Sequence, residues 1–127
     1  MNYTSVEQSK KLLELGISPE TADLKFKYDH NEHHCIEIPM MVIVPNWDDE
    51  YNKDIPCWSV GALLEIMPII IRKDKRHYYT LHIIGHRKVI YAKNRCVFHK
   101  EIARPLIDAC YNMVVWLLEN NFIRKRE

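Results

Sequence analysis

Glycine is scarce in this sequence, with three residues in 127. Phosphate-binding loops need several glycines at fixed spacing, and neither GxGxxG nor GxxxxGKS/T occurs here. The patterns GxSxG, HExxH and the EF-hand calcium loop are missing as well. Without any of these signatures, we expect a protein that is not an enzyme and binds no cofactor.

Long apolar runs and paired cysteines are also missing. The apolar run 66–71 has six residues and contains Pro68, whereas a membrane span needs about 20 apolar residues. The first seven residues have neither the basic nor the apolar region of a secretory signal. The cysteines form no CxxC pair. We therefore expect a cytoplasmic protein with no membrane partner and four reduced thiols, namely Cys35, Cys57, Cys96 and Cys110.

What is present fits one globular domain over residues 1–127. Hydrophobic residues make up 47% and charged residues 28%, which is ordinary for such domains. A chain of this length buries roughly two-thirds of the surface that its unfolded form exposes. One hydrophobic core is therefore enough to hold it together.

Capping signals and apolar spacing predict three main helices. Thr4 and Glu7 form a capping box at the start of the first helix, and Gly16 supplies its left-handed end. Ser59 caps a short helix over 60–67. The last helix runs from about Pro105 to Asn120. Its apolar residues repeat on more than one side, so we place Trp116 and Leu117 in or beside the core.

Alternation and turn residues predict the strands between these helices. Leu24 to Tyr28 alternates as a half-buried strand, and Cys35 to Val44 is an edge strand because it contains Pro39. Pro45 to Pro56 is a loop. Three strands at 77–84, 87–92 and 95–98 form a C-terminal meander. The fold class predicted is α+β, with a small, mostly antiparallel sheet packed against two or three helices.

Charge is distributed unevenly along the chain. Residues 1–71 contain 5 Lys and Arg against 12 Asp and Glu, a net charge of −7. Residues 72–104 contain 10 Lys and Arg against 2 acidic residues, a net charge of +8. The two parts either neutralise each other, within one fold or across a dimer, or the basic part binds an acidic partner.

The basic segment is the candidate nucleic-acid interface. Cations interleaved with aromatic residues on a small sheet can follow phosphates and stack on bases. We expect its principal cations to form one exposed positive surface: Arg72, Lys73, Lys75, Arg76, Arg87 and Lys88. A total charge near zero argues against long-range steering toward nucleic acid.

The candidate metal ligands are His30, His33, His34 and Cys35. Imidazole and thiolate are good zinc ligands, and Cys57 is a further thiol that is able to join them. Neighbouring side chains such as His33 and His34 seldom face one ion, so we favour a polar turn. The acidic loop around Asp48, Asp49, Glu50 and Asp54 is interpreted as solvated. Ser59 is interpreted as a helix cap and not as a nucleophile.

Three blocks of the sequence carry a resemblance. They cover 49 of the 127 residues: EQSKKLLELGISPETAD (7–23), IPCWSVGALLEIMP (55–68) and LIDACYNMVVWLLENNFI (106–123). Together they resemble a group of small uncharacterised proteins of gut bacteria that often occur in phage-like or mobile-element regions. The resemblance implies a bacterial cytoplasmic setting and assigns no activity.

The sequence thus leaves three functions in order of preference. The first is a non-enzymatic interaction module that binds a protein partner or itself. The second is a small nucleic-acid-binding accessory protein that uses residues 72–104. The third is a metal-dependent enzyme.

Overall fold

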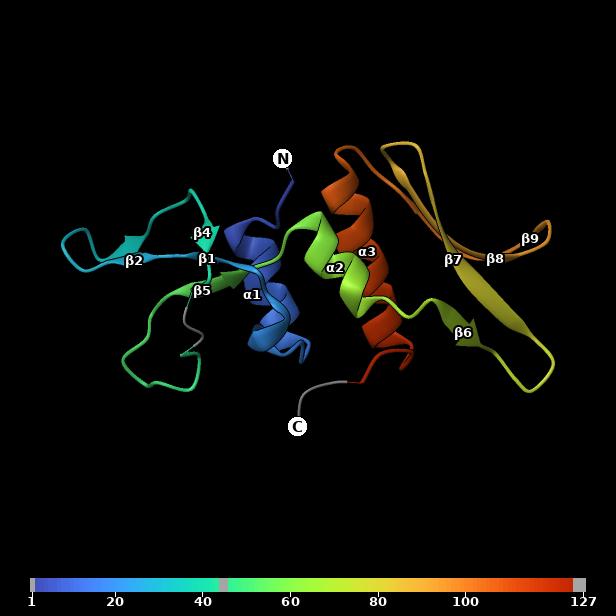
Figure 1. Cartoon of the computed structure of the whole chain (residues 1–127), viewed down its shortest axis with the longest axis horizontal. Helices are drawn as coiled ribbons and strands as arrows, with labels where there is room; N and C mark the ends of the chain where they lie inside the picture. The colour runs from blue at the N-terminus through green and yellow to red at the C-terminus, as the bar shows by residue number, and fades with distance from the viewer. Residues whose placement is uncertain (1, 44–45, 125–127) are drawn as a thin grey trace.

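The computed structural model describes residues 2–43 and 46–124. Three helices stand between two groups of strands that lie at opposite ends of the long axis (Figure 1). The predicted α+β class is confirmed. In chain order the elements are α1 (Val6–Glu14), the 3-10 turn η1 (Pro19–Thr21), β1 (Leu24–Phe26), β2 (Tyr28–Asp29), β3 (His34–Cys35), β4 (Met40–Met41), β5 (Ile55–Cys57), α2 (Val60–Ile66), β6 (Ile70–Arg72), β7 (Tyr78–Ile84), β8 (Lys88–Lys93), β9 (Cys96–Ile102) and α3 (Leu106–Glu119).

The first helix uses a different cap from the one predicted. Ser5 is the N-cap, accepting a hydrogen bond from the backbone of Gln8 while the Gln8 side chain accepts one from the backbone of Ser5. Thr4 is buried, and its hydroxyl accepts a hydrogen bond from the backbone of Trp58. The predicted capping box of Thr4 and Glu7 is therefore wrong, because a tertiary contact occupies the Thr4 hydroxyl.

The other predicted helix ends are confirmed. Gly16 follows α1 with a φ of 101°, a left-handed conformation that glycine adopts without strain, and Ile17 N–H donates back to the Leu12 carbonyl. Ser59 caps α2 by accepting a hydrogen bond from Ala62 N–H. Each end is fixed by residues within a few positions, which explains why local sequence signals predicted it.

The N-terminal strands form a small antiparallel sheet and a separate hairpin. In the sheet β1 lies between β4 and β5, and the hairpin pairs β2 with β3. The strand predicted over Leu24 to Tyr28 is interrupted after Phe26. The predicted edge strand is confirmed only as β4, and Val44 lies outside the described residues. The loop predicted over 45–56 ends at Asp54, because β5 pairs with β1.

The C-terminal sheet has four strands in the order β6-β7-β8-β9, all antiparallel. The three-strand meander is confirmed, with turns at Gly85 (φ 64°) and Asn94 (φ 56°). The fourth strand, β6, was not predicted, because its three residues lie between a proline and a charged turn. A register shift at Tyr91 and Ala92 marks an irregularity where β9 pairs with β8.

The core lies where α3 packs against α2 and against β8 and β9. Figure 1 shows α3 with α2 on one side and the C-terminal sheet on the other. Leu117 and Trp58 are fully buried, and Trp116 packs on the core edge against Phe122 and His99. The prediction that Trp116 and Leu117 lie in or beside the core is confirmed.

Candidate functional site

The strands beyond α1 form an arm that has almost no core of its own. We define the N-terminal arm as residues 27–55, the left end of the molecule in Figure 1. Of its described residues, 27–43 and 46–55, none is buried. Backbone pairing and local hydrogen bonds therefore shape the arm more than side-chain packing does. One such bond joins Asp54 Oδ1 to Tyr28 N–H at 2.7 Å.

The same arm carries a concentration of exposed apolar side chains. Ile38 is 77% exposed, Met41 73% and Ile43 88%. Scattered apolar residues are normal on a protein surface, whereas a contiguous group usually marks an interaction site. This group follows one short stretch of chain, and its members are Ile36, Ile38, Met40, Met41 and Ile43.

A cleft of about 580 Å³ lies between α1 and the β2–β3 hairpin. Three of the predicted metal ligands, His33, His34 and Cys35, contribute to its wall, together with Glu7 and Lys10 of α1. The fourth, His30, packs its ring edge-on against Tyr28 with the ring centroids 5.0 Å apart. The structure thus brings three of the four predicted residues to one cleft.

These residues are not arranged as a metal site. Within the described part of the chain, no group of three or more His, Cys, Asp or Glu side chains has metal-binding geometry. His34 Nδ1 lies 3.0 Å from the Cys35 carbonyl, and Cys35 Sγ donates to the Lys53 carbonyl at 3.6 Å. These contacts are those of a hairpin turn, and His33 occupies its left-handed position with a φ of 58°.

Three thiols, those of Cys35, Cys57 and Cys110, are poorly suited to nucleophilic chemistry. Burial raises the pKa of Cys35, and the nearby carboxylate of Asp54 raises it further. Burial raises the pKa of Cys57 and of Cys110 to about 11. A reactive cysteine needs a lowered pKa, because the thiolate is the nucleophile. All four cysteines are free thiols, as expected from the sequence.

The second unusual surface is the side of the C-terminal sheet that faces away from α3. Val89 and Tyr91 of β8 point into the core, so Ile90 and its neighbours across the ladder point outward. Four apolar side chains on this side are exposed by 46–52%. We call it the outer sheet face; it consists of Ile70, Ile84, Ile90, Val97 and Ile102, with Arg72, Lys88 and Lys100 among them.

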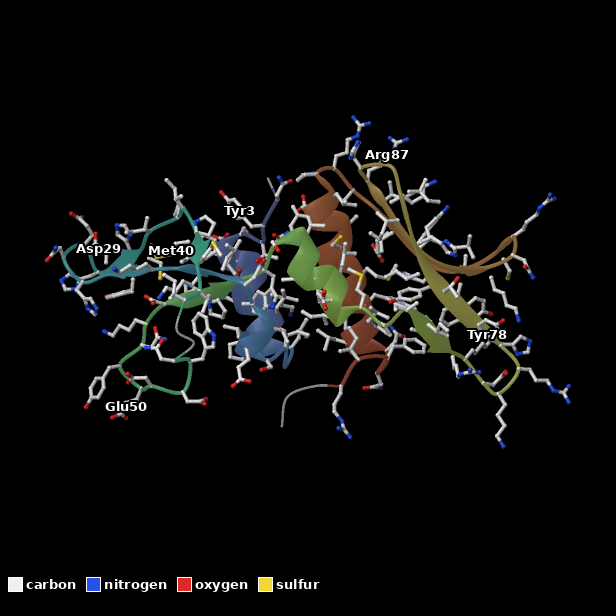
Figure 2. All side chains as sticks on the ribbon, in the orientation of Figure 1. Tyr3, Asp29, Met40, Glu50, Tyr78 and Arg87 are labelled. Atoms are coloured by element: carbon white, nitrogen blue, oxygen red, sulfur yellow. The ribbon has the colours of Figure 1, made fainter. Side chains whose placement is uncertain are left out.

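The structure divides the six predicted nucleic-acid-binding cations into two groups. Arg72, Lys73, Lys75 and Arg76 lie together at the β6–β7 turn, and all are exposed. Arg87 and Lys88 lie at the β7–β8 turn. Arg72 pairs with Tyr78 and Lys88 with Ile84, so the two groups are about 20 Å apart along β7. Figure 2 shows this separation through Tyr78 and Arg87.

One member of the first group, Arg72, lies beside an aromatic side chain together with Lys93 of β8. The Arg72 guanidinium lies 5.6 Å from the centroid of the Tyr78 ring, and Lys93 Nζ lies 3.9 Å from it. A cavity of about 380 Å³ adjoins this ring and is also lined by His77 and Arg95. The interleaving of cations and aromatic residues over 72–104 pointed to this region, but Lys93 was not among the six principal cations chosen from the sequence.

Sequence reasoning also missed both apolar surfaces. It treated Cys35 to Val44 as an edge strand and gave residues 69–71 no strand or surface role. The signal was present in the run IEIPMMVI at 36–43, which is too apolar for a strand at the rim of a sheet. Whether a segment is exposed depends on which element packs against it, and the sequence alone did not identify that element.

Among the described residues, no helix has the length and apolar character needed to cross a bilayer.

Comparison with known proteins adds no relationship to these observations. The sequence matches no protein-family model, and no curated protein or solved structure is similar to it.

Proposed function

We propose that this protein is a non-enzymatic interaction module that binds another protein chain through its exposed apolar surfaces. The observation that carries the proposal is the N-terminal arm, in which large apolar residues from Ile36 to Ile43 are exposed while no described residue is buried. A contiguous apolar patch in water is costly, and covering it with a partner recovers hydrophobic free energy. The setting we propose is the bacterial cytoplasm, within a mobile element.

The chemistry of the arm supports binding more than catalysis. Its cleft contains histidine, thiol and carboxylate groups, but the Cys35 thiol has a raised pKa and donates to a backbone carbonyl. General acid–base or nucleophilic catalysis needs a base within hydrogen-bond reach of an activated group. The arm offers an exposed apolar strip that includes Met40 and Met41, and protein interfaces have an apolar centre in which methionine is enriched.

Site-specific photo-crosslinking in bacterial cells tests this function. A photoreactive amino acid in place of Met41 should give a covalent adduct of defined mass, and the added substitution Ile38→Lys should abolish it. The same amino acid in place of Glu65, exposed on α2, is the control and should give no such adduct. If position 41 yields nothing above this control, the arm is not a binding surface and the proposal fails.

A second candidate function is nucleic-acid binding at the β6–β7 end of the sheet. The observation in its favour is the Tyr78 ring between Arg72 and Lys93, beside a cavity. An aromatic ring with adjacent cations is able to stack on a base and contact its phosphate. The separation of the two cation groups limits this reading, because one end of β7 alone offers a short footprint.

The dependence of affinity on salt concentration tests whether the protein binds nucleic acid. Binding to single-stranded nucleic acid should weaken with a log–log slope of about −0.7 per phosphate neutralised. Arg72→Glu with Arg76→Glu should then abolish binding without lowering the melting temperature. Glu65→Lys, which changes the net charge far from Tyr78, serves as the control. An affinity that is unaffected by the double substitution would remove this candidate.

A further inference from the structure

We infer that the partner of the N-terminal arm is the outer sheet face of a second copy of this chain, in a head-to-tail contact. The inference rests on the proposed function, since it names what the interaction module binds. Three features of the molecule support it: opposite charge, matching apolar content, and the position of the two surfaces at opposite ends.

The two surfaces carry opposite charge. The arm contains 7 Asp and Glu against 2 Lys, a net charge of −5, whereas residues 72–104 carry +8. Asp54 of the arm forms an ion pair at 3.1 Å with Lys25 of the adjoining strand β1, and Asp74 forms one at 2.8 Å with His77 within the basic segment. The helices hold the acidic and basic ends apart in one copy (Figure 1). Neutralisation between copies satisfies both ends, and like surfaces repel each other.

The two surfaces also match in apolar content. On the arm, Glu37 is exposed between Ile36 and Ile38. On the outer sheet face, Lys100 pairs across the ladder with Ile90, and Lys88 pairs with Ile102. The strip from Ile36 to Ile43 and the outer sheet face thus each combine apolar side chains with charges of one sign, negative on the strip and positive on the sheet. Contact between them buries apolar area while it places carboxylates beside ammonium groups.

The geometry favours a contact between unlike surfaces. In Figure 2, Asp29, Met40 and Glu50 mark the arm at one end, and Tyr78 and Arg87 mark the sheet at the other. The arm of one copy therefore reaches the sheet of the next copy, leaving a free arm and a free face. Such heterologous contacts build rings or open chains. Wild-type protein should show a concentration-dependent series of oligomers.

Two blocking substitutions test the inference. Ile38→Lys places a cation on the arm, where the basic sheet repels it, and Ile84→Glu places an anion on the outer sheet face. Each variant alone should be monomeric, with self-association weakened at least about tenfold. Mixed in equal amounts, they should form a heterodimer and nothing larger, because one intact arm and one intact face remain.

Ile69 provides the matched control. Its side chain is 76% exposed, nearly the same as that of Ile38, but it pairs with Leu81 at the sheet edge on the α3 side. Ile69→Lys and Ile69→Glu repeat both charge changes outside the two surfaces, and both variants should assemble like the wild type. Circular dichroism melting of every variant confirms that loss of assembly is not loss of folding.

Sedimentation equilibrium at 50 and 500 mM NaCl gives the result. The inference predicts assembly that weakens with salt, since charges at a partly exposed interface are screened. A wild-type protein that remains monomeric at 50 mM NaCl and high concentration overturns it. So does a mixture of the two variants that stays monomeric. An adduct from position 41 with a different protein would leave the proposed function standing and remove the second copy as partner.

Discussion

Both ends of this molecule carry large apolar side chains, but one end buries them and the other exposes them. In the C-terminal half, α3 and β8 turn their apolar residues toward each other, and Val89, Tyr91 and Leu117 are fully buried. In the N-terminal arm, comparable residues such as Ile38 and Met41 point into solvent. The difference lies in the availability of a second layer, because a strand buries a face only where another element packs against it.

The comparison explains where stability and recognition reside. A segment that buries its apolar surface within the fold stabilises the folded state. A segment that leaves this surface exposed gains hydrophobic free energy only when a partner covers it. The outer sheet face is intermediate, because its strands are held by the core on one side while Ile84 and Ile102 are exposed on the other.

Amide hydrogen exchange should show the largest contrast between the two ends. We expect amides of α3 to exchange only on global unfolding, with an opening free energy of about 5–15 kcal/mol. Amides of 27–55 should open at a small fraction of that cost, since few buried contacts hold them. The measurement needs the monomeric Ile38→Lys variant. Equal protection at both ends would show that the arm has a core of its own.

Truncation of single side chains should give the next largest difference. Leu117→Ala removes a fully buried side chain and should lower the free energy of unfolding by about 2–5 kcal/mol. Ile38→Ala should change it by less than about 0.5 kcal/mol, because the side chain is already in water. Urea denaturation of dilute samples measures both. A comparable loss for the two variants would contradict the division between core and arm.

Alkaline pH should weaken the core through its buried thiols. Burial raises the pKa of Cys57 and of Cys110 from 9.0 to about 11, so the folded state favours the neutral thiol. Their contribution is complete below pH 9 and is lost as pH rises through 11, by about 3 kcal/mol per thiol in all. Urea denaturation at pH 8 and 10.5 should record a loss that is smaller in the double variant Cys57→Ala, Cys110→Ala. An equal pH dependence in both proteins would exclude the thiols as its source.

The helix caps should give the smallest effects. Ser5→Ala should cost about 1 kcal/mol, because Ser5 caps α1 through a reciprocal pair of hydrogen bonds with Gln8. Ser18→Ala removes a single exposed contact of 3.4 Å at the start of a three-residue turn and should cost less. Thermal melting compares the two variants. A larger loss of stability in Ser18→Ala would mean that the cap of η1 contributes more to folding than the cap of α1.

Local signals predicted most of the helices and the meander. Gly16, Ser59 and Asn120 were identified from the sequence because each ends or begins a helix through contacts within a few residues. Strand β6 escaped prediction because its three residues gain stability only by pairing with β7. The cap of α1 was displaced by one residue for the same kind of reason, since Thr4 bonds to Trp58, far along the chain.

The candidate sites were less predictable than the fold. The residues His33, His34 and Cys35 do meet at one cleft, but His34 Nδ1 and Cys35 Sγ contact backbone carbonyls there. The basic residues were correctly identified as a segment, yet β7 holds the two groups about 20 Å apart. Composition identifies which groups are present, while distances between them follow from register and twist.

By itself the sequence determined the α+β class, most of the helix ends, the apolar character of α3 and the imbalance of charge between its two parts. These follow from periodicity, capping and composition, which act over a few residues or over the whole chain. Only the tertiary structure decided which apolar residues are covered. Leu117 is buried and Ile38 is exposed because α3 packs against a sheet and a helix, whereas no described element packs over the strip from Ile36 to Ile43. A residue is buried when an element from elsewhere in the chain packs against it. Local sequence does not predict which element that is.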